Sequence, residues 1–147
     1  MEGVEIKELQ AYEDHRGWLA EIFREDETDF RAAMSYLSMT KPGLARGPHE
    51  HEKQTDYFCF IGSFRLYLWD NRKTSLTYGE KEVIDTPENP CVAIVPPGIV
   101  HAYKNIGDNE GIVINMPDKL YMGRGKAEPV DEIRYEDEIS SPFRIEE

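Results

Sequence analysis

Cysteine is scarce in this chain of 147 residues, and long hydrophobic runs are absent. The two cysteines, Cys59 and Cys91, lie inside short apolar runs, which is typical of buried thiols in a reducing compartment and makes a disulfide the less favoured alternative. No stretch approaches the ~20 apolar residues that cross a bilayer, and the N-terminal "MEGVEIKELQ" lacks the apolar centre of a signal peptide. We therefore expect a cytoplasmic protein.

Basic side chains are also few: 17 lysines and arginines stand against 29 acidic residues, which gives a formal net charge of −12. Such a charge repels polyanions and argues against a general affinity for nucleic acid or an anionic membrane. It does not exclude a small anionic ligand, because such a ligand responds to a local cluster of arginines. The expected partner is therefore a small molecule, with no nucleic acid and no membrane.

Short strands dominate the pattern, and residues 1–147 are expected to form one domain. Apolar runs rich in β-branched and aromatic residues, bounded by glycine and proline, predict strands at 57–61, 64–69, 91–95 and 111–116. Only 27–37 and 130–137 are compatible with a helical turn. Regular short strands without long helices indicate an all-β sandwich or barrel. The charged residues 123–147 are expected to be a C-terminal tail that wraps the barrel.

Three of the four histidines fall in two motifs. His49 and His51 are two residues apart, so both side chains point to the same side of an extended chain. His101 follows a Pro-Gly turn in "PPGIVHAYKN", and the turn delivers it onto the next strand. Each histidine alone is most simply a satisfied polar residue on a strand, whereas three in two ordered motifs favour a common site. The residues by themselves leave proton transfer and metal binding open.

Together with Gly47, the two motifs closely resemble those of the cupin superfamily, a small antiparallel barrel in which they converge. Asp56 stands near the position of the cupin carboxylate, although aspartate reaches less far than the usual glutamate. Three imidazoles and a carboxylate suit iron, manganese, nickel or zinc. The metal alternative therefore comprises His49, His51, Asp56 and His101.

Four longer blocks carry a more specific resemblance: "EDHRGWLAEIFR" (13–24), "SMTKPGLARGPH" (38–49), "DNRKTSLTYGE" (70–80) and "VPPGIVHAY" (95–103). In this order they are similar to the dTDP-4-dehydrorhamnose 3,5-epimerase family, cupin-like enzymes that need no metal. The resemblance implies a cupin-type antiparallel β-barrel (jelly roll) with little helix and no cofactor. It also implies that a dTDP-4-keto-6-deoxyhexose is epimerised by proton abstraction α to the ketone.

The same resemblance implies roles for individual residues. His49 would be the base, and His101 would lie beside the reacting sugar. A carboxylate, Asp137 in "IRYED" or less favourably Asp131, would fix the tautomer of the base. Arginines would hold the diphosphate, because their planar donors suit phosphate oxygens. The expected substrate-binding residues are Arg16, Arg46, His51, Asp56 and Tyr103.

Two positions depart from the family pattern. The lysine that stabilises the enolate would fall near Asp56, and the tyrosine that acts as the acid would fall near Ile114 or Asn115. A phenol from elsewhere in the chain would have to substitute, and the sequence does not place any of them. The candidates are Tyr103, Tyr57 and Tyr36.

Other functions therefore stay open. A sugar 3,4-ketoisomerase is the main alternative, because its similar "RG-H-H" block would give His51 a proton to move. A metal-dependent cupin enzyme and a non-catalytic sugar-binding cupin are the others. In each case we expect a homodimer, in which an N-terminal strand from "VEIKEL" adds to the sheet of the neighbouring chain and covers its open edge.

Overall fold

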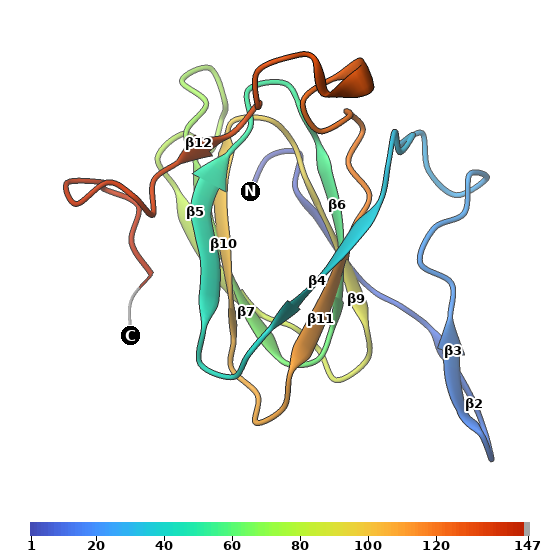
Figure 1. Cartoon of the computed structure of the whole chain (residues 1–147). Coiled ribbons are helices and arrows are strands. Elements are labelled where there is room, and N and C mark those ends of the chain that lie inside the picture. Colours follow the sequence, from blue (N-terminus) through green and yellow to red (C-terminus); the bar gives the residue numbers. More distant parts are fainter. Residues whose placement is uncertain (146–147) are drawn as a thin grey trace.

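Two antiparallel sheets pack face to face in the computed structural model, which describes residues 1–145 (Figure 1). The first sheet consists of β1 (Glu5–Glu8), β9 (Cys91–Val95), β6 (Asp56–Ile61), β11 (Gly111–Asn115) and β4 (Tyr36–Thr40), in that order. The second consists of β12 (Ile133–Arg134), β5 (Ala45–Glu50), β10 (Ile99–Asn105), β7 (Phe64–Asp70) and β8 (Lys81–Asp85). A hairpin of β2 (Ala11–Asp14) and β3 (Gly17–Ala20) stands apart from both sheets.

The connections define a jelly roll. Between β4 and β11 the chain passes to the other sheet at every connection except the one that joins β7 to β8. This leaves the orders 4-11-6-9 and 5-10-7-8, the double-sheet arrangement of jelly-roll proteins. The expectation of an all-β antiparallel barrel is confirmed.

The segments 27–37 and 130–137, whose sequences are compatible with a helical turn, do not form one. Both segments are irregular until they enter β4 and β12, and the helix among the described residues is the 3-10 turn η1 (Arg124–Lys126). The pairing of Tyr36–Thr40 with β11 and of Ile133–Arg134 with β5 outweighs the weak local preference of these residues. No helix in residues 1–145 is long and apolar enough to cross a membrane.

Strand alternation separates an inner core from two outer ones. On β6, Phe58 and Phe60 point between the sheets, whereas Tyr57 and Cys59 point outward to a second apolar cluster. Cys91 is the cross-strand partner of Phe60 and therefore lies on the inner side. Both cysteines are buried free thiols on opposite faces of the sheet, which confirms the expectation that they are buried.

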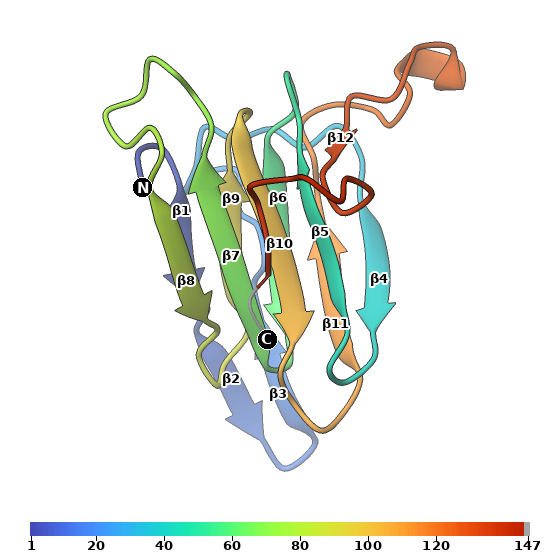
Figure 2. The ribbon, with the colours of Figure 1, turned by 90° about the vertical axis from the view of Figure 1, so that its left-hand side faces the viewer.

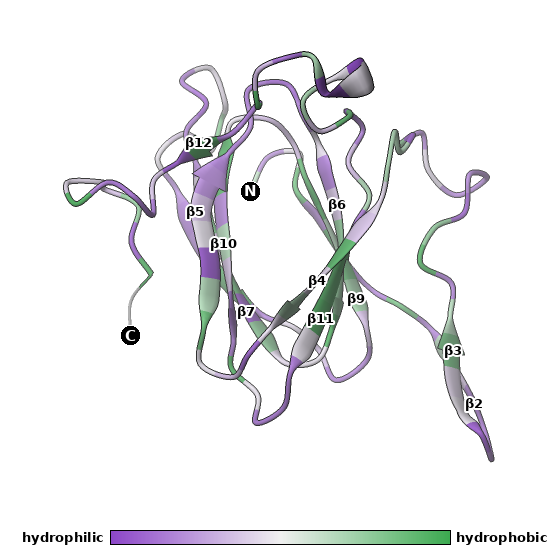
Figure 3. Ribbon diagram, viewed as in Figure 1, coloured by the Kyte–Doolittle hydropathy of each residue, from purple (hydrophilic) through white to green (hydrophobic). Residues whose placement is uncertain are grey.

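The C-terminal tail covers the outer face of the second sheet. The tail that follows β12 runs across β5 and β10 (dark red in Figure 2). Its Phe143 ring lies 5.9 Å from that of Trp69 on β7 and 4.7 Å from that of Tyr135. Hydrophobic residues concentrate along β11, while the upper part of β5 is hydrophilic (Figure 3).

The N-terminal strand stays within its own chain. β1 pairs with β9, with Glu5 opposite Ile94, so the expected addition of this strand to a neighbouring sheet does not describe the structure. The "DNRKTSLTYGE" block forms the adjoining loop, in which the buried Asp70 accepts hydrogen bonds from Arg72, Ser75 and Thr77. These bonds, led by that of Arg72, hold the pKa of Asp70 well below its ordinary value. This block therefore builds a loop, and the N–H of Asn71 donates to the carbonyl oxygen of Gly98 in the turn before β10.

Candidate active site

The three motif histidines meet at one mouth of the barrel. His49 on β5 is the cross-strand partner of His101 on β10, and their ring centroids are 4.4 Å apart. The ring of His51 lies 5.9 Å from the first and 5.8 Å from the second. The three histidines therefore share one site, as the two sequence motifs predict.

Gly47 makes this approach of β5 to β10 feasible. Its φ of +82° is rarely adopted by other residues, and a Cβ there would lie 2.6 Å from the backbone oxygen of His101. The pairing of the two strands shifts register just beyond His101. The glycine thus accommodates an irregularity that aims two histidines at one point.

A buried carboxylate lies beneath the histidines. Asp56 begins β6 on the opposite sheet, and its Oδ2 is 3.2 Å from Nε2 of His51 and 3.4 Å from Nε2 of His101. Its Oδ1 accepts hydrogen bonds from the amides of Gln54 and Asn115, each at 2.8 Å. Burial would raise the pKa of Asp56, but His51 and His101 outweigh burial and hold it at about 2.

His51 is held as an imidazolium. Its Nδ1 contacts the carbonyl oxygen of Asp131, which can only accept, and its Nε2 faces the Asp56 carboxylate. Burial lowers the pKa of His51, yet these two neighbours outweigh burial and raise it to about 9. The Asp131 carboxylate in turn accepts from the backbone N–H groups of residues 52–54. Asp131 therefore fixes the loop that carries His51.

His101 is fully buried and incompletely bonded. Its Nδ1 donates to the carbonyl oxygen of Ile99 at 3.0 Å, so in the neutral ring Nε2 carries the lone pair. Burial lowers the pKa of His101. Within residues 1–145, neither its Nε2 nor Oδ2 of Asp56 has an aligned hydrogen-bond partner. A void of about 10 Å³ adjoins the ring, lined mainly by aromatic and aliphatic side chains, so the barrel below the site is filled.

His49 is a neutral imidazole. Burial, together with electrostatic repulsion of a second positive charge by His101 and His51, lowers its pKa to about 2. The carboxylate at its far nitrogen is Glu132, whose Oε1 lies 4.0 Å from Nδ1. The sequence missed Glu132, because only the path of the tail along β5 reveals it.

The prediction that Asp137 pairs with His49 is not met. Arg134 of β12 lies opposite His49, and the chain then turns away from β5, which leaves Asp137 exposed in a turn. Asp131, the less favoured alternative, is committed to the loop at 52–54 as described above. Glu132, one residue after Asp131 and five residues before Asp137, is therefore the carboxylate that faces Nδ1 of His49.

The other predicted binding residues are scattered. Arg46 is on β5 and donates to Thr40 Oγ1 at 3.3 Å and to the carbonyl oxygen of Met39 at 3.0 Å, so it connects the two sheets beside the site. Tyr103 is buried in the inner core against Phe58 and other rings. Arg16 pairs with Asp14 at the tip of the β2–β3 hairpin, far from the histidines of its own chain (Figure 1).

The substitute phenols are also placed. Tyr57 points away from the site and donates to the carbonyl oxygen of Ile22. Tyr36 points toward the site, because its hydroxyl accepts a hydrogen bond from Asn115, the residue that also donates to Asp56. The position of Tyr36 near the site follows from the register of β4 against β11, which cannot be read from the sequence.

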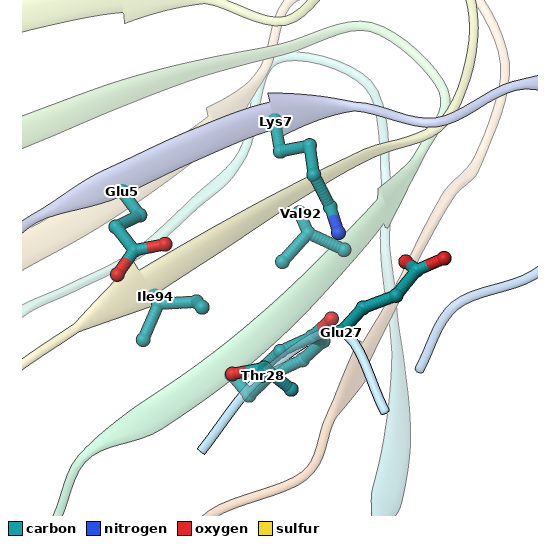
Figure 4. Close-up of a pocket in the computed structure, with 7 residues that line it drawn as sticks. Glu5, Lys7, Glu27, Thr28, Val92 and Ile94 are labelled. Carbon is teal, nitrogen blue, oxygen red and sulfur yellow. The ribbon is translucent and has the colours of Figure 1, made fainter. Parts of the chain in front are cut away.

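A hollow of about 60 Å³ lies elsewhere, on the outer face of the first sheet (Figure 4). Tyr57, Val92 and Ile94 form its floor, and Glu5, Lys7, Glu27 and Thr28 surround it. It contains no histidine and opens on the opposite side of the sheet from Asp56. We therefore assign the chemistry to the histidine site.

A jelly-roll barrel whose mouth holds a histidine cluster from the H-x-H and P-x-G-x-x-H motifs defines the cupin class of proteins. Residues 1–138 match the family model described as dTDP-4-dehydrorhamnose 3,5-epimerase, and the chain belongs to this family. It is accordingly an enzyme of the isomerase class, a carbohydrate epimerase or isomerase.

Two similar proteins are described by a role in glycan or polysaccharide biosynthesis. The probable low-salt glycan biosynthesis epimerase Agl13 of Haloferax volcanii is 41% identical over 123 residues, which are 80% of this chain and 79% of that protein. The spore coat polysaccharide biosynthesis protein SpsL of Bacillus subtilis is 34% identical over 117 residues, 78% of each chain.

Solved structures share the fold. A dTDP sugar isomerase of Desulfovibrio desulfuricans has a TM-score of 0.82 and 24% identity, and the match covers 97% of this chain and 90% of that one. The 3'-monoepimerase ChmJ of Streptomyces bikiniensis, solved in complex with dTDP-quinovose, has a TM-score of 0.75 and 23% identity over 90% of this chain and 69% of that one.

The histidine pKa values predict a stability maximum near pH 6.5. His51 is raised from 6.5 to about 9, so its contribution is complete below 6.5 and is lost as the pH rises through 9. His49 and His101 are lowered, so below 6.5 the unfolded chain binds protons that the folded chain does not, and stability is lost there too.

Melting temperatures measured from pH 4.5 to 9.5 in the presence of a chelator should trace this maximum. The variant His51→Gln should lose less stability between pH 6.5 and 9 than the parent, because it has no imidazolium to deprotonate. An equally steep alkaline loss in both proteins would show that His51 is neutral in the folded chain.

Proposed function

We propose that this enzyme epimerises a dTDP-linked 4-keto-6-deoxyhexose by proton abstraction α to the ketone. The observation that carries the proposal is the pairing of a neutral, buried base, His49, with an imidazolium, His51, in one cluster. A base must accept a proton from carbon while a positive group stabilises the enolate oxygen that forms. The family and the epimerases similar to this chain support the same class of reaction.

In the proposed step, Nε2 of His49 takes the proton from the carbon next to the ketone. The electron pair of the broken C–H bond forms the C=C bond of the enolate, and the carbonyl oxygen takes the negative charge. Glu132, on the Nδ1 side, favours the imidazolium of His49 that results. His51 supplies positive charge at this site, where the lysine position of the family is occupied by Asp56. His101 completes the wall beside the sugar.

This arrangement favours an epimerase over a 3,4-ketoisomerase. An isomerase would use both histidines of the H-x-H motif to carry protons. Both ring nitrogens of His51 are committed to acceptors, Asp131 and Asp56, which suits a fixed charge better than a proton carrier.

His49→Asn tests the base. Turnover of a dTDP-4-keto-6-deoxyhexose should fall roughly 10²–10⁴-fold, because asparagine cannot accept the proton, while affinity for dTDP stays within a few-fold. Uptake of solvent deuterium into the sugar, followed by mass spectrometry, should fall in parallel. A His49→Asn enzyme within a few-fold of the parent would remove the assignment.

Arg46 is proposed to hold the diphosphate. It lies on the same strand as His49, and with a net charge of −12 binding must depend on nearby cations rather than on the overall field. Arg46→Ala should weaken dTDP binding by about 1.5–3 kcal/mol in calorimetry, the size of a lost charged hydrogen bond. Arg46→Lys should restore only part of the affinity for dTDP, because an ammonium lacks the planar, paired N–H donors of a guanidinium. Unchanged affinity in Arg46→Ala, with a lowered melting temperature, would mean that the bonds to Met39 and Thr40 are its whole role.

A metal-dependent cupin enzyme is the second candidate, and one observation favours it. The ligand atoms of His49, His51 and His101 lie within 4.8 Å of one another, and the unpartnered oxygen of Asp56 adjoins two of them. These four donors fit iron, manganese, nickel or zinc, which would act as a Lewis acid on a carbonyl oxygen.

We propose that epimerisation needs no such ion. Protein purified without a histidine tag should contain well under one equivalent of these metals, and a chelator should leave turnover unchanged. One equivalent of metal, together with activity that is lost on chelation and regained on adding the ion, would establish the second candidate instead.

A homodimer is also proposed. The β2–β3 hairpin projects from the barrel and carries Trp18 and Leu19, which are 50% and 63% exposed. Leu37 on the outer side of edge strand β4 is 71% exposed. Apolar surface of this kind is suited to a second copy, and pairing would also allow Arg16 to approach a site in the other chain.

Light scattering at micromolar concentration should give twice the mass of 17.0 kDa, and Trp18→Asp should shift the equilibrium to monomer. A monomeric parent would contradict the proposal.

A further inference from the structure

Tyr36 faces the interior of the barrel at the same mouth as the histidines. It is the cross-strand partner of Asn115, and residues paired across antiparallel strands project from the same face of the sheet. Asn115 is buried and on the inner face, since its side-chain amide donates to Asp56. The next residue of β4, Leu37, points outward and is exposed.

Three hydrogen bonds fix the amide that holds the phenol. The Oδ1 of Asn115 accepts from the backbone N–H of Tyr57 at 3.1 Å, and its Nδ2 donates to Asp56 Oδ1 at 2.8 Å and to the Tyr36 hydroxyl oxygen at 3.0 Å. The first partner can only donate and the second can only accept, so the amide cannot be reversed. The Tyr36 oxygen therefore accepts, and its own hydrogen has no acceptor among residues 1–145.

The phenol and the base come from opposite walls of the opening. His49 is on β5 of the second sheet and Tyr36 is on β4 of the first, and these two strands face each other across the barrel (Figure 1). Inverting a carbon requires that a proton leave from one face of the sugar and return to the other. Tyr103 and Tyr57 do not meet this requirement, because the first is sealed in the core and the second points outward.

We propose that Tyr36 is the general acid that protonates the enolate on the face opposite His49. This inference rests on the proposed epimerase function and supplies the phenol that the family position near Asn115 lacks. In the step, the O–H bond of Tyr36 breaks and a C–H bond forms at the former carbanion carbon. The enolate C=C electrons make this bond, the carbonyl is restored, and a phenolate remains. Solvent then returns a proton to Tyr36 and removes one from His49.

The surroundings of Tyr36 suit this task. Asn115 donates to the hydroxyl oxygen and so stabilises the phenolate as it develops. Burial raises the pKa of Tyr36 to about 12, so the phenol stays protonated until an enolate reaches it. The residue is 46% exposed, which gives solvent access to the oxygen after the transfer.

Tyr36→Phe separates the acid from the base. The variant should epimerise roughly 10²–10⁴-fold more slowly than the parent but still incorporate solvent deuterium with retention of configuration, because His49 can exchange its proton and return it to the same face. Tyr78→Phe, on an exposed loop, is the matched control and should behave as the parent. Proton NMR of the sugar in D2O reports both processes at once.

Two outcomes of this experiment would overturn the inference. Epimerisation within a few-fold of the parent would show that another group is the acid, and equal loss of exchange and epimerisation would show that Tyr36 acts before the proton returns. A parent that neither exchanges nor epimerises any 4-keto sugar tested would instead refute the proposed function. Replacing Tyr36 with 3,5-difluorotyrosine keeps the shape and lowers the phenol pKa, so the alkaline limb of epimerisation should move to lower pH. If the alkaline limb of the pH profile does not move, the result opposes the assignment of Tyr36, even if the phenylalanine variant is poorly folded.

Discussion

The buried carboxylate of Asp56 is the group on which the site depends. It begins β6 in one sheet, and it contacts His51 and His101, which belong to the other. A charge in this position is costly unless neighbours compensate it. Two amides donate to Oδ1, and the His51 imidazolium lies 3.2 Å from Oδ2. The same contact that ties the sheets at the mouth also sets which histidine is charged. Stability and chemistry thus share one residue.

The two departures from the family pattern are consequently linked. With an aspartate in the lysine position, the positive charge moves to His51, which lies on the other side of the carboxylate. With an asparagine near the tyrosine position, the amide connects Asp56 to Tyr36 on the next strand. One hydrogen-bonded chain, Tyr36–Asn115–Asp56, therefore carries both changes. A lysine at position 56 would place a cation beside His51 and leave the Asn115 amide with one of its two acceptors, the Tyr36 oxygen.

The parts of the site that lie in local motifs were predictable from the sequence, and the rest were not. His49 and His51 follow from the two-residue period of a strand, and the turn before His101 places it, so their convergence needed little long-range information. Tyr36 depends on the register of β4 against β11, and Glu132 on where the tail meets β5. The prediction of Asp137 failed for the same reason. The strand content was predictable from composition, whereas the weak helical signals gave way to pairing across the sheets.

The tail belongs to the site as much as the barrel does. Glu132 reaches His49 and Asp131 holds His51, yet β12 contributes only two residues of pairing to β5. Such a short pairing is weak by itself, so the position of both carboxylates depends on what anchors the tail beyond it. Beyond this pairing, the N–H groups of Tyr135 and Glu136 donate to the carbonyl oxygen of Pro48, and Tyr135 and Phe143 pack on the outer face of the second sheet. Before it, the Asp131 carboxylate accepts from the backbone of residues 52–54. Because several contacts share this task, losing the Phe143 contact would loosen the end of the tail, while Asp131 and the bonds to Pro48 still hold Glu132 beside His49.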